Sequence, residues 1–181
     1  MNRTIFGIAI VFLFLALGAC ADEQNFDQVD DLEVIPTAAT SIFYFESDEN
    51  TINQAPIGAF YTQTFTFEAF NQDFVADNVL DGTITYQVEN TTSKQLDILI
   101  EFLDAAGNVL DTENFIIQPE PTALIERQIT YGPGGRNLDI LINTTDIRVV
   151  GTNLGDNTSQ SSAPQPLIIL RSSAVFRVRL L

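Results

Sequence analysis

The chain has 181 residues, of which 24 are acidic and eight are basic, so its formal net charge at neutral pH is −16. This charge excludes nucleic acid and anionic lipid surfaces as electrostatic partners, because no basic cluster of useful size is present. The chain contains no histidine and one cysteine. That composition excludes Ser–His and Cys–His nucleophiles and imidazole metal ligands, and no cofactor is expected.

The first 19 residues have the pattern of a cleaved secretory signal. Arg3 precedes an apolar run from Ile5 to Leu17, which at about 13 residues is shorter than the roughly 20 that a membrane-spanning helix needs. The run ends in Leu17, Gly18, Ala19 and Cys20, which resemble the bacterial lipobox. The resemblance implies that Cys20 is lipidated and becomes the mature N-terminus. The alternative is an ordinary signal peptide that ends in Ala-Cys.

Residues 20–36 form a predicted acidic tether. Six acids and no base lie between Asp22 and Glu33, and the segment lacks a helical or strand period, so we expect a disordered spacer that ends at Pro36. Acids just after the cysteine resemble the signal that sends Bacteroidota lipoproteins to the outer cell surface. This resemblance implies an outer-membrane protein anchored by the lipid on Cys20, and leaves open whether it faces the periplasm or the cell exterior.

Residues 37–181 are predicted to form a single β domain. Period-two alternation is clearest in residues 82–90, where Ile84, Tyr86 and Val88 share one face. Residues 95–103 carry apolar residues on both faces, which predicts a central strand. Turn residues separate such runs at intervals of about 8–12 residues, as in Asp104 to Asn108, where Gly107 offers positive φ. We therefore predict an all-β, antiparallel, Ig-like β-sandwich of about 7–9 strands.

Two segments of this domain are ambiguous. Residues 138–143 suit either a short helix or a strand, because the apolar run is too short to show a period. Residues 167–181 suit either a hairpin that turns at Ser172-Ser173 or one bent strand.

Residues 82–131 resemble the core of bacterial Ig-like modules of the FxLYD and LEA14-like type. The matching pieces are Val88-Glu89-Asn90-Thr91, Phe102-Leu103-Asp104 with Gly107, and Pro119. Members of that family often carry a tyrosine between the leucine and the aspartate, which this chain lacks. The whole chain is also similar to flavobacterial membrane-anchored lipoproteins that share its "FDQ…DDLE…PT" opening. Neither resemblance implies an activity, because sandwich folds host unrelated functions.

Two arrangements could support catalysis. Ser93 and Lys94 could form a dyad, but we expect both on an exposed hairpin turn, where a lysine keeps its proton. Four glutamates on predicted neighbouring strands could include a glycosidase pair about 5–9 Å apart. Outward positions on half-exposed strands explain them more simply. They are Glu89, Glu101, Glu113 and Glu126.

Other candidate sites are weaker. Asp77, Asp81 and Asp156 lie in oxygen-rich loops that could bind calcium, although Asp residues more often form turns there. Arg171, Arg177 and Arg179 could form a basic patch for an anionic glycan or a protein partner, or could pair with acids on neighbouring strands. An exposed aromatic edge is a further candidate, at residues 43–45 or at residues 60–61.

These observations predict a protein that is not an enzyme. The leading hypothesis is a non-catalytic envelope lipoprotein that presents its sandwich for protein binding, adhesion or structural assembly. The alternative is a glycan or small-ligand binding component of an outer-membrane complex, followed by a carboxylate-based hydrolase. A flat apolar edge strand would favour a protein partner bound by strand addition. A shallow aromatic platform would favour a glycan, and a deep cleft with two converging carboxylates would favour the hydrolase.

Overall fold

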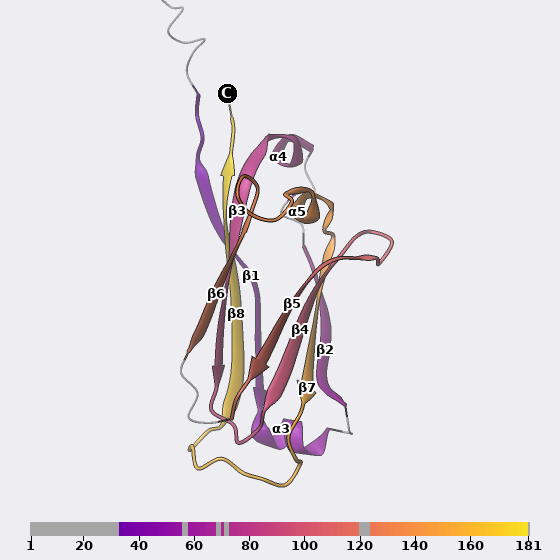
Figure 1. Ribbon diagram of the computed structural model, residues 1–181, viewed down its shortest axis with the longest axis vertical. Coiled ribbons are helices and arrows are strands. Elements are labelled where there is room, and N and C mark those ends of the chain that lie inside the picture. The colour runs from indigo at the N-terminus through magenta and orange to yellow at the C-terminus, as the bar shows by residue number, and fades with distance from the viewer. Residues whose placement is uncertain (1–32, 56–57, 68–69, 71–72, 120–123, 181) are drawn as a thin grey trace, which may run out of the picture. The chain divides into compact units, whose positions relative to one another are not determined.

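The computed structural model describes residues 33–55, 58–67, 70, 73–119 and 124–180. The predicted signal, the lipobox, Cys20 and nearly all of the acidic tether lie outside these residues. One compact unit spans Val34–Leu181 and is mostly strand (Figure 1). In chain order its elements are β1 (Thr37–Asp48), α3 (Glu49–Gln54), β2 (Ala59–Thr66), α4 (Asp73–Asn78), β3 (Val79–Asn90), β4 (Leu96–Leu103), β5 (Val109–Ile117), β6 (Ile125–Tyr131), α5 (Asp139–Asn143), β7 (Asp146–Asn153) and β8 (Leu167–Val178).

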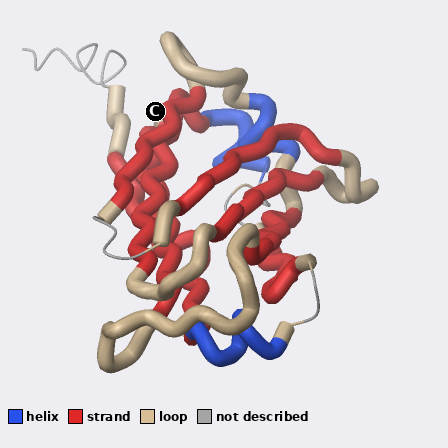
Figure 2. The backbone as a smooth tube through the Cα atoms, turned by 60° about the horizontal axis from the view of Figure 1, so that its bottom comes forward, coloured by secondary structure: helices blue, strands red, loops and turns tan. Residues whose placement is uncertain are grey.

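The strands form two four-stranded sheets, in the orders β1-β8-β3-β6 and β2-β7-β4-β5. Every pairing is antiparallel, and Figure 2 shows the short helices at the ends of the strands. This confirms an all-β antiparallel sandwich, with eight strands. Only β4 and β5 are neighbours both in sequence and in a sheet, whereas the Ig arrangement pairs several consecutive strands. The order found is that of an eight-stranded jelly roll, in which the chain repeatedly crosses between sheets.

The core lies between the sheets and follows the predicted alternation. On β3 the side chains of Ile84, Tyr86 and Val88 are fully buried, which confirms the predicted inward face. On β4 the inward residues Ile98, Ile100 and Phe102 are also fully buried. Since β4 lies between β7 and β5, its prediction as a central strand is confirmed.

The hairpin between β4 and β5 forms for local reasons. The Asp104 carboxylate accepts hydrogen bonds from the backbone N–H groups of Ala106 and Asn108, at 2.9 and 2.8 Å. Gly107 adopts φ +80°, which a residue without Cβ does at little cost. The two ambiguous segments are also resolved: residues 139–143 form the helix α5, and residues 167–178 form the single strand β8.

The two open sides of the sandwich are closed in different ways. Between β1 and β2, aromatic rings pack across the gap: the ring centroids of Phe43 and Phe65 are 5.3 Å apart, and those of Phe45 and Tyr61 are 3.9 Å apart. Phe43 and Phe45 are therefore buried, and of residues 43–45 only Tyr44 is exposed.

Between β5 and β6 the gap is closed by charges. Glu113, expected to face outward, is instead buried and forms ion pairs with Arg127 and with Arg136. Arg136 also pairs with Asp111 at 2.7 Å. The prediction for Glu113 is wrong because its alternation places it inside, where two guanidinium groups compensate its charge.

Candidate functional site

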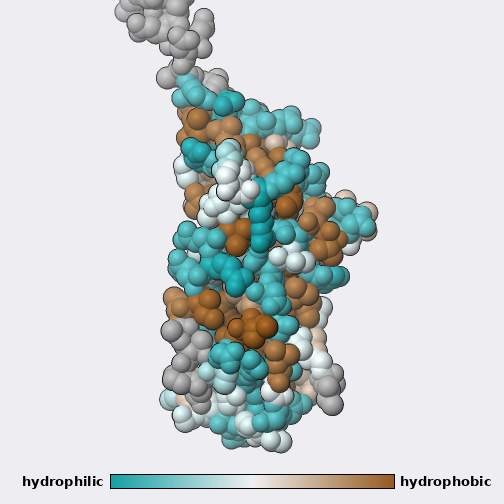
Figure 3. Space-filling view, viewed as in Figure 1, coloured by the Kyte–Doolittle hydropathy of each residue, from teal (hydrophilic) through white to brown (hydrophobic). Residues whose placement is uncertain are grey.

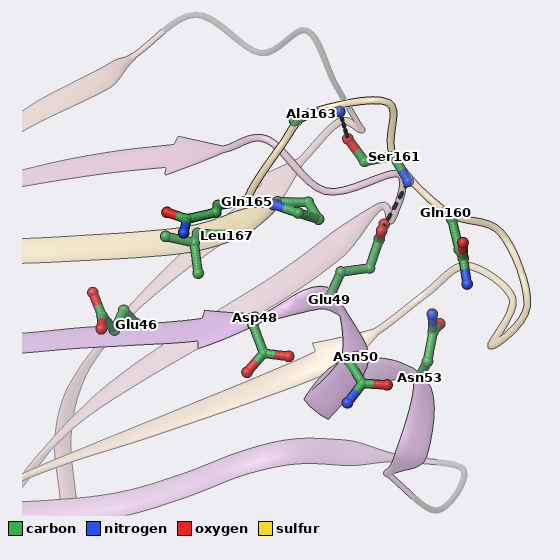
Figure 4. A pocket seen from close by; sticks show the side chains of 11 residues that line it. Glu46, Asp48, Glu49, Asn50, Asn53, Gln160, Ser161, Ala163, Gln165 and Leu167 are labelled. Carbon is green, nitrogen blue, oxygen red and sulfur yellow. Dashed lines mark hydrogen bonds between the residues drawn. The ribbon is translucent and has the colours of Figure 1, made fainter.

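A polar cavity of about 600 Å³ lies at the end of the sandwich where α3 meets the loop between β7 and β8 (Figure 4). The cavity is lined by Glu46, Asp48, Glu49, Asn50, Asn53, Gln160, Ser161, Ala163, Gln165, Pro166 and Leu167. Asp48 is the N-cap of α3: its carboxylate accepts the Thr51 N–H at 2.8 Å. This local capping places the next residue, Glu49, at the inner wall of the cavity.

Glu49 is only 4% exposed. Its carboxylate accepts the backbone N–H of Ser93 at 2.5 Å and that of Ser161 at 2.8 Å, and the second contact is visible in Figure 4. Burial alone would raise the pKa of Glu49, but these hydrogen bonds and the charge of Lys94 outweigh it, so the pKa lies below its ordinary value. The hydrogen bonds from Thr51 likewise lower the pKa of Asp48.

These pKa directions bear on the hydrolase alternative. A glycosidase needs one protonated carboxylic acid, whose pKa is raised by its surroundings. Asp48 and Glu49 are both held in the ionised form and are both used to fix the backbone. This cavity therefore supplies no such acid from either residue. The four glutamates named above do not gather here either: Glu113 faces the interior, and Glu101 pairs with Arg148 at 2.7 Å.

Lys94 is not the exposed hairpin tip that we expected. Its side chain is buried, and its ammonium group donates to the Ser159 carbonyl at 2.7 Å and to the Asp156 carboxylate at 3.3 Å. The prediction is wrong because the loop between β7 and β8, some 60 residues away, folds over this turn. An ammonium group that donates to a carbonyl and a carboxylate is a structural cation, so the Ser93–Lys94 pair does not form a catalytic dyad.

An apolar groove of about 580 Å³ lies at the opposite end, between the start of β1, the end of β2, α4 and the end of β8. Its lining includes Phe70, Phe74 and Phe176, with Leu180 at its rim, and Phe74 and Leu180 are 51% and 46% exposed. Sequence reasoning missed this groove. The spacing of the phenylalanines at positions 67, 70 and 74 was the available signal.

The chain enters the described unit beside this groove. The Leu180 N–H donates to the Val34 carbonyl at 2.9 Å, and the Val178 N–H donates to the Pro36 carbonyl at 3.2 Å. Pro36 itself lines the groove. The end of the predicted tether is thus fixed at the apolar end of the sandwich, whereas α3, which lines the polar cavity, lies at the other end (Figure 1).

The three aspartates predicted as calcium candidates do not converge. Asp77 and Asp81 lie on α4 and β3, whereas Asp156 lies in the loop at the α3 end. Asp156 accepts hydrogen bonds from the Ser159 hydroxyl and from the N–H groups of Ser159 and Thr158, which lower its pKa and make it a turn former. Within the described residues, no group of three or more Asp, Glu, Cys or His is arranged to hold a metal ion.

Arg171 and Arg177 lie on β8, and Arg179 follows its last residue. Arg177 pairs with Asp81 of β3, which is the cross-strand pairing that the sequence left open. Arg171 instead lies over the Tyr44 ring, with its guanidinium carbon 5.9 Å from the ring centroid. Arg179 follows β8 near the apolar groove, where its backbone N–H donates to the Asn78 carbonyl at 2.9 Å.

Three of the four edge strands are irregular. Register shifts interrupt the pairing of β1, β2 and β5 with their neighbours, and such bulges protect a sheet edge against pairing with another chain. On the face shown in Figure 3, hydrophobic residues are interspersed with hydrophilic ones. Protein binding by strand addition thus has little support at these three edges. In the described part of the chain, no helix is both long and apolar enough to cross a membrane.

No protein-family model matches the chain, and no curated protein matches it. Solved structures that match the chain include T=1 particles derived from infectious bursal disease virus, with 10% identity, a TM-score of 0.40, and coverage of 80% of this chain and 32% of the other. Bacillus endospore appendages match with 8% identity and a TM-score of 0.38, over 88% and 96% of the two chains. Desmodium yellow mottle tymovirus matches with 7% identity and a TM-score of 0.40, over 83% and 84%. At these values the likeness says nothing about the role of this chain.

Proposed function

We propose that this chain is a non-catalytic envelope lipoprotein whose β-sandwich binds a protein partner. The observation that carries this proposal is the apolar groove at the tether end of the domain, where Phe74 and Leu180 are about half exposed. Exposed apolar surface of this kind on a strongly acidic chain is typical of an interaction site. The commitment of Asp48 and Glu49 to backbone contacts supports the non-catalytic part.

The proposed anchor is the lipid on Cys20. The sequence Leu17-Gly18-Ala19-Cys20 supports it, and the acidic residues that follow support placement at the outer membrane. Fifteen residues lie between Cys20 and Pro36, and these 16 residue steps span at most about 55 Å, so the groove lies within about that distance of the proposed anchor. We expect a Cys20→Ser variant to lose fatty-acid labelling. A variant that stays membrane-bound would contradict lipid anchoring.

Protein binding at the groove is tested with two matched leucines. Leu180 lies at the groove and is 46% exposed, whereas Leu154 follows β7 at the opposite end and is 48% exposed. After mild cross-linking of membranes, we expect a partner to copurify with the wild type and with Leu154→Asp, but not with Leu180→Asp. Recovery of the same proteins with the wild type and with both variants would refute a partner at the groove.

A second candidate function is glycan binding as part of an outer-membrane complex. The observation that favours it is the exposed ring of Tyr44 beside Arg171 on the outer face of a sheet. Polysaccharide retention separates this function from protein binding, because the two sites lie on different parts of the domain.

A further inference from the structure

The outer face of the sheet β1-β8-β3-β6 carries polar side chains in rows that cross all four strands. The pairing register aligns Tyr44 of β1 with Arg171 of β8, Arg171 with Gln87 of β3, and Gln87 with Glu126 of β6. The next row places Ser173 of β8 opposite Thr85 of β3. Because the side chains of a row project from the same face, these groups form one continuous hydrogen-bonding surface.

A bulge in β1 opens this surface. Pairing with β8 steps from Ser41–Ser173 directly to Phe43–Ser172, which leaves Ile42 as the extra residue. A hollow of about 360 Å³ lies here, and we name it the bulge hollow. Tyr44, Thr85, Gln87, Arg171, Ser172 and Ser173 are among its lining residues. Its volume is at the small end of the range for ligand pockets, about 300–1,000 Å³, and suits a single ring.

Ser172 is among the lining residues, but its side chain faces away from the outer surface. It is 3% exposed and is aligned with Phe43 and Tyr86, both buried in the core, so its hydroxyl lies on the inner face of the sheet. The groups that the hollow offers to a ligand are therefore those of the outward-facing rows.

The remaining groups supply a stacking surface and several free hydrogen-bonding positions. The Tyr44 ring is 52% exposed and is held in place because its hydroxyl donates to Glu46. Arg171 is exposed and forms no ion pair with the described residues. Gln87 donates through its amide nitrogen to Glu126 at 3.0 Å, which leaves its amide oxygen free to accept.

We propose that the bulge hollow binds one sugar ring of a neutral polysaccharide. The apolar face of the sugar stacks on Tyr44, and its hydroxyls exchange hydrogen bonds with Arg171 and Gln87. A neutral polymer fits best because Glu46, Glu89 and Glu126 lie close to the hollow in the pairing register and the chain as a whole carries −16, both of which repel polyanions. This inference rests on the second candidate function and is independent of the protein partner at the groove.

The test is affinity electrophoresis of the folded protein in native gels that contain one polysaccharide each. The neutral probes are β-1,3-glucan, xylan, galactomannan and starch, and the acidic probes are alginate and polygalacturonate. We expect a neutral polymer to retard the wild type, and we expect Tyr44→Ala to weaken that binding about tenfold or more, which corresponds to about 1.4 kcal/mol. Gln87→Ala should weaken it less.

Val175→Ala is the matched control. Val175 is also exposed on the outer face of β8 but is not among the residues that line the hollow, so its retardation should equal that of the wild type. Thermal melting of each variant verifies folding before binding is compared.

Three results would overturn the inference: no retardation by any neutral probe, retardation by acidic probes only, or equal retardation of Tyr44→Ala and the wild type. Leu180→Asp should keep its polysaccharide retention, and Tyr44→Ala should keep its copurifying partner. Failure at one site is therefore distinguishable from failure at the other.

Discussion

Glu49 holds the loop between β7 and β8 onto the turn between β3 and β4. In a Glu49→Ala variant, the N–H groups of Ser93 and Ser161 both lose their acceptor. Each unsatisfied buried donor costs about 1–3 kcal/mol. Both donors are only partly buried, so water reaches them in part, and the lower half of the summed range applies. We expect the free energy of unfolding to fall by roughly 2–4 kcal/mol.

A Glu49→Gln variant separates the hydrogen bonds from the charge. The amide keeps one acceptor oxygen for one of the two donors but turns its NH₂ group toward the other. We expect it to lose about half as much stability as Glu49→Ala, roughly 1–2 kcal/mol. Urea unfolding followed by far-UV circular dichroism measures both losses, with an unchanged dependence on urea concentration.

The pH dependence has a defined sign. The pKa of Glu49 is lower in the folded state than its ordinary value, so the unfolded chain binds the proton more tightly. The stabilisation by the charge is therefore fully present above the unfolded pKa, about 4.3, and is lost as the pH falls through the folded pKa. We expect the stability difference between the wild type and Glu49→Gln to narrow between pH 7 and pH 3.

Glu46 provides the control for this experiment. Glu46 lines the same cavity but is exposed, and within the described residues its carboxylate accepts a hydrogen bond only from the Tyr44 hydroxyl. Glu46→Ala should cost less than about 0.5 kcal/mol. The reasoning is refuted if Glu49→Ala costs no more than Glu46→Ala, or if Glu49→Gln unfolds with the same pH dependence as the wild type.

Two further variants test the charged end and the core. Lys94→Met should lower the free energy of unfolding by about 1–3 kcal/mol in urea, because the Ser159 carbonyl loses its donor. The carboxylate of Asp156 is 57% exposed and stays solvated. A variant more stable than the wild type would show that desolvation of the ammonium group outweighs its contacts. Phe102→Ala, fully buried on β4, should cost about 3–5 kcal/mol in the same assay, and a loss below about 1 kcal/mol would contradict its place in the core.

Local patterns were enough to predict the strands and some turns. The alternation around Ile84 and Tyr86 predicts a half-buried strand because successive side chains face opposite sides. The turn at Asp104 and Gly107 follows from a side chain that accepts nearby N–H groups and a residue that tolerates positive φ. Such features depend on neighbours within a few residues, so they are visible in the sequence.

The order of the strands is a different matter. The resemblance of residues 82–131 to Ig-like modules rests on strand lengths and turns, which a jelly roll shares. What separates the two folds is which strands lie side by side, such as β8 between β1 and β3. That order depends on contacts between residues up to about 140 positions apart, and no local pattern encodes it.

The sequence by itself predicts a lipid anchor and an acidic tether, and it determined the all-β class and the inward faces of the strands, since each depends on composition or on short-range alternation. Only the tertiary structure decided which individual charged side chains are buried. Lys94 and Glu113 are charged and were expected outside, yet both are buried because partners from distant segments compensate their charge. The bulge hollow arises in the same way, because Tyr44, Arg171 and Gln87 meet only when three strands pair in one register.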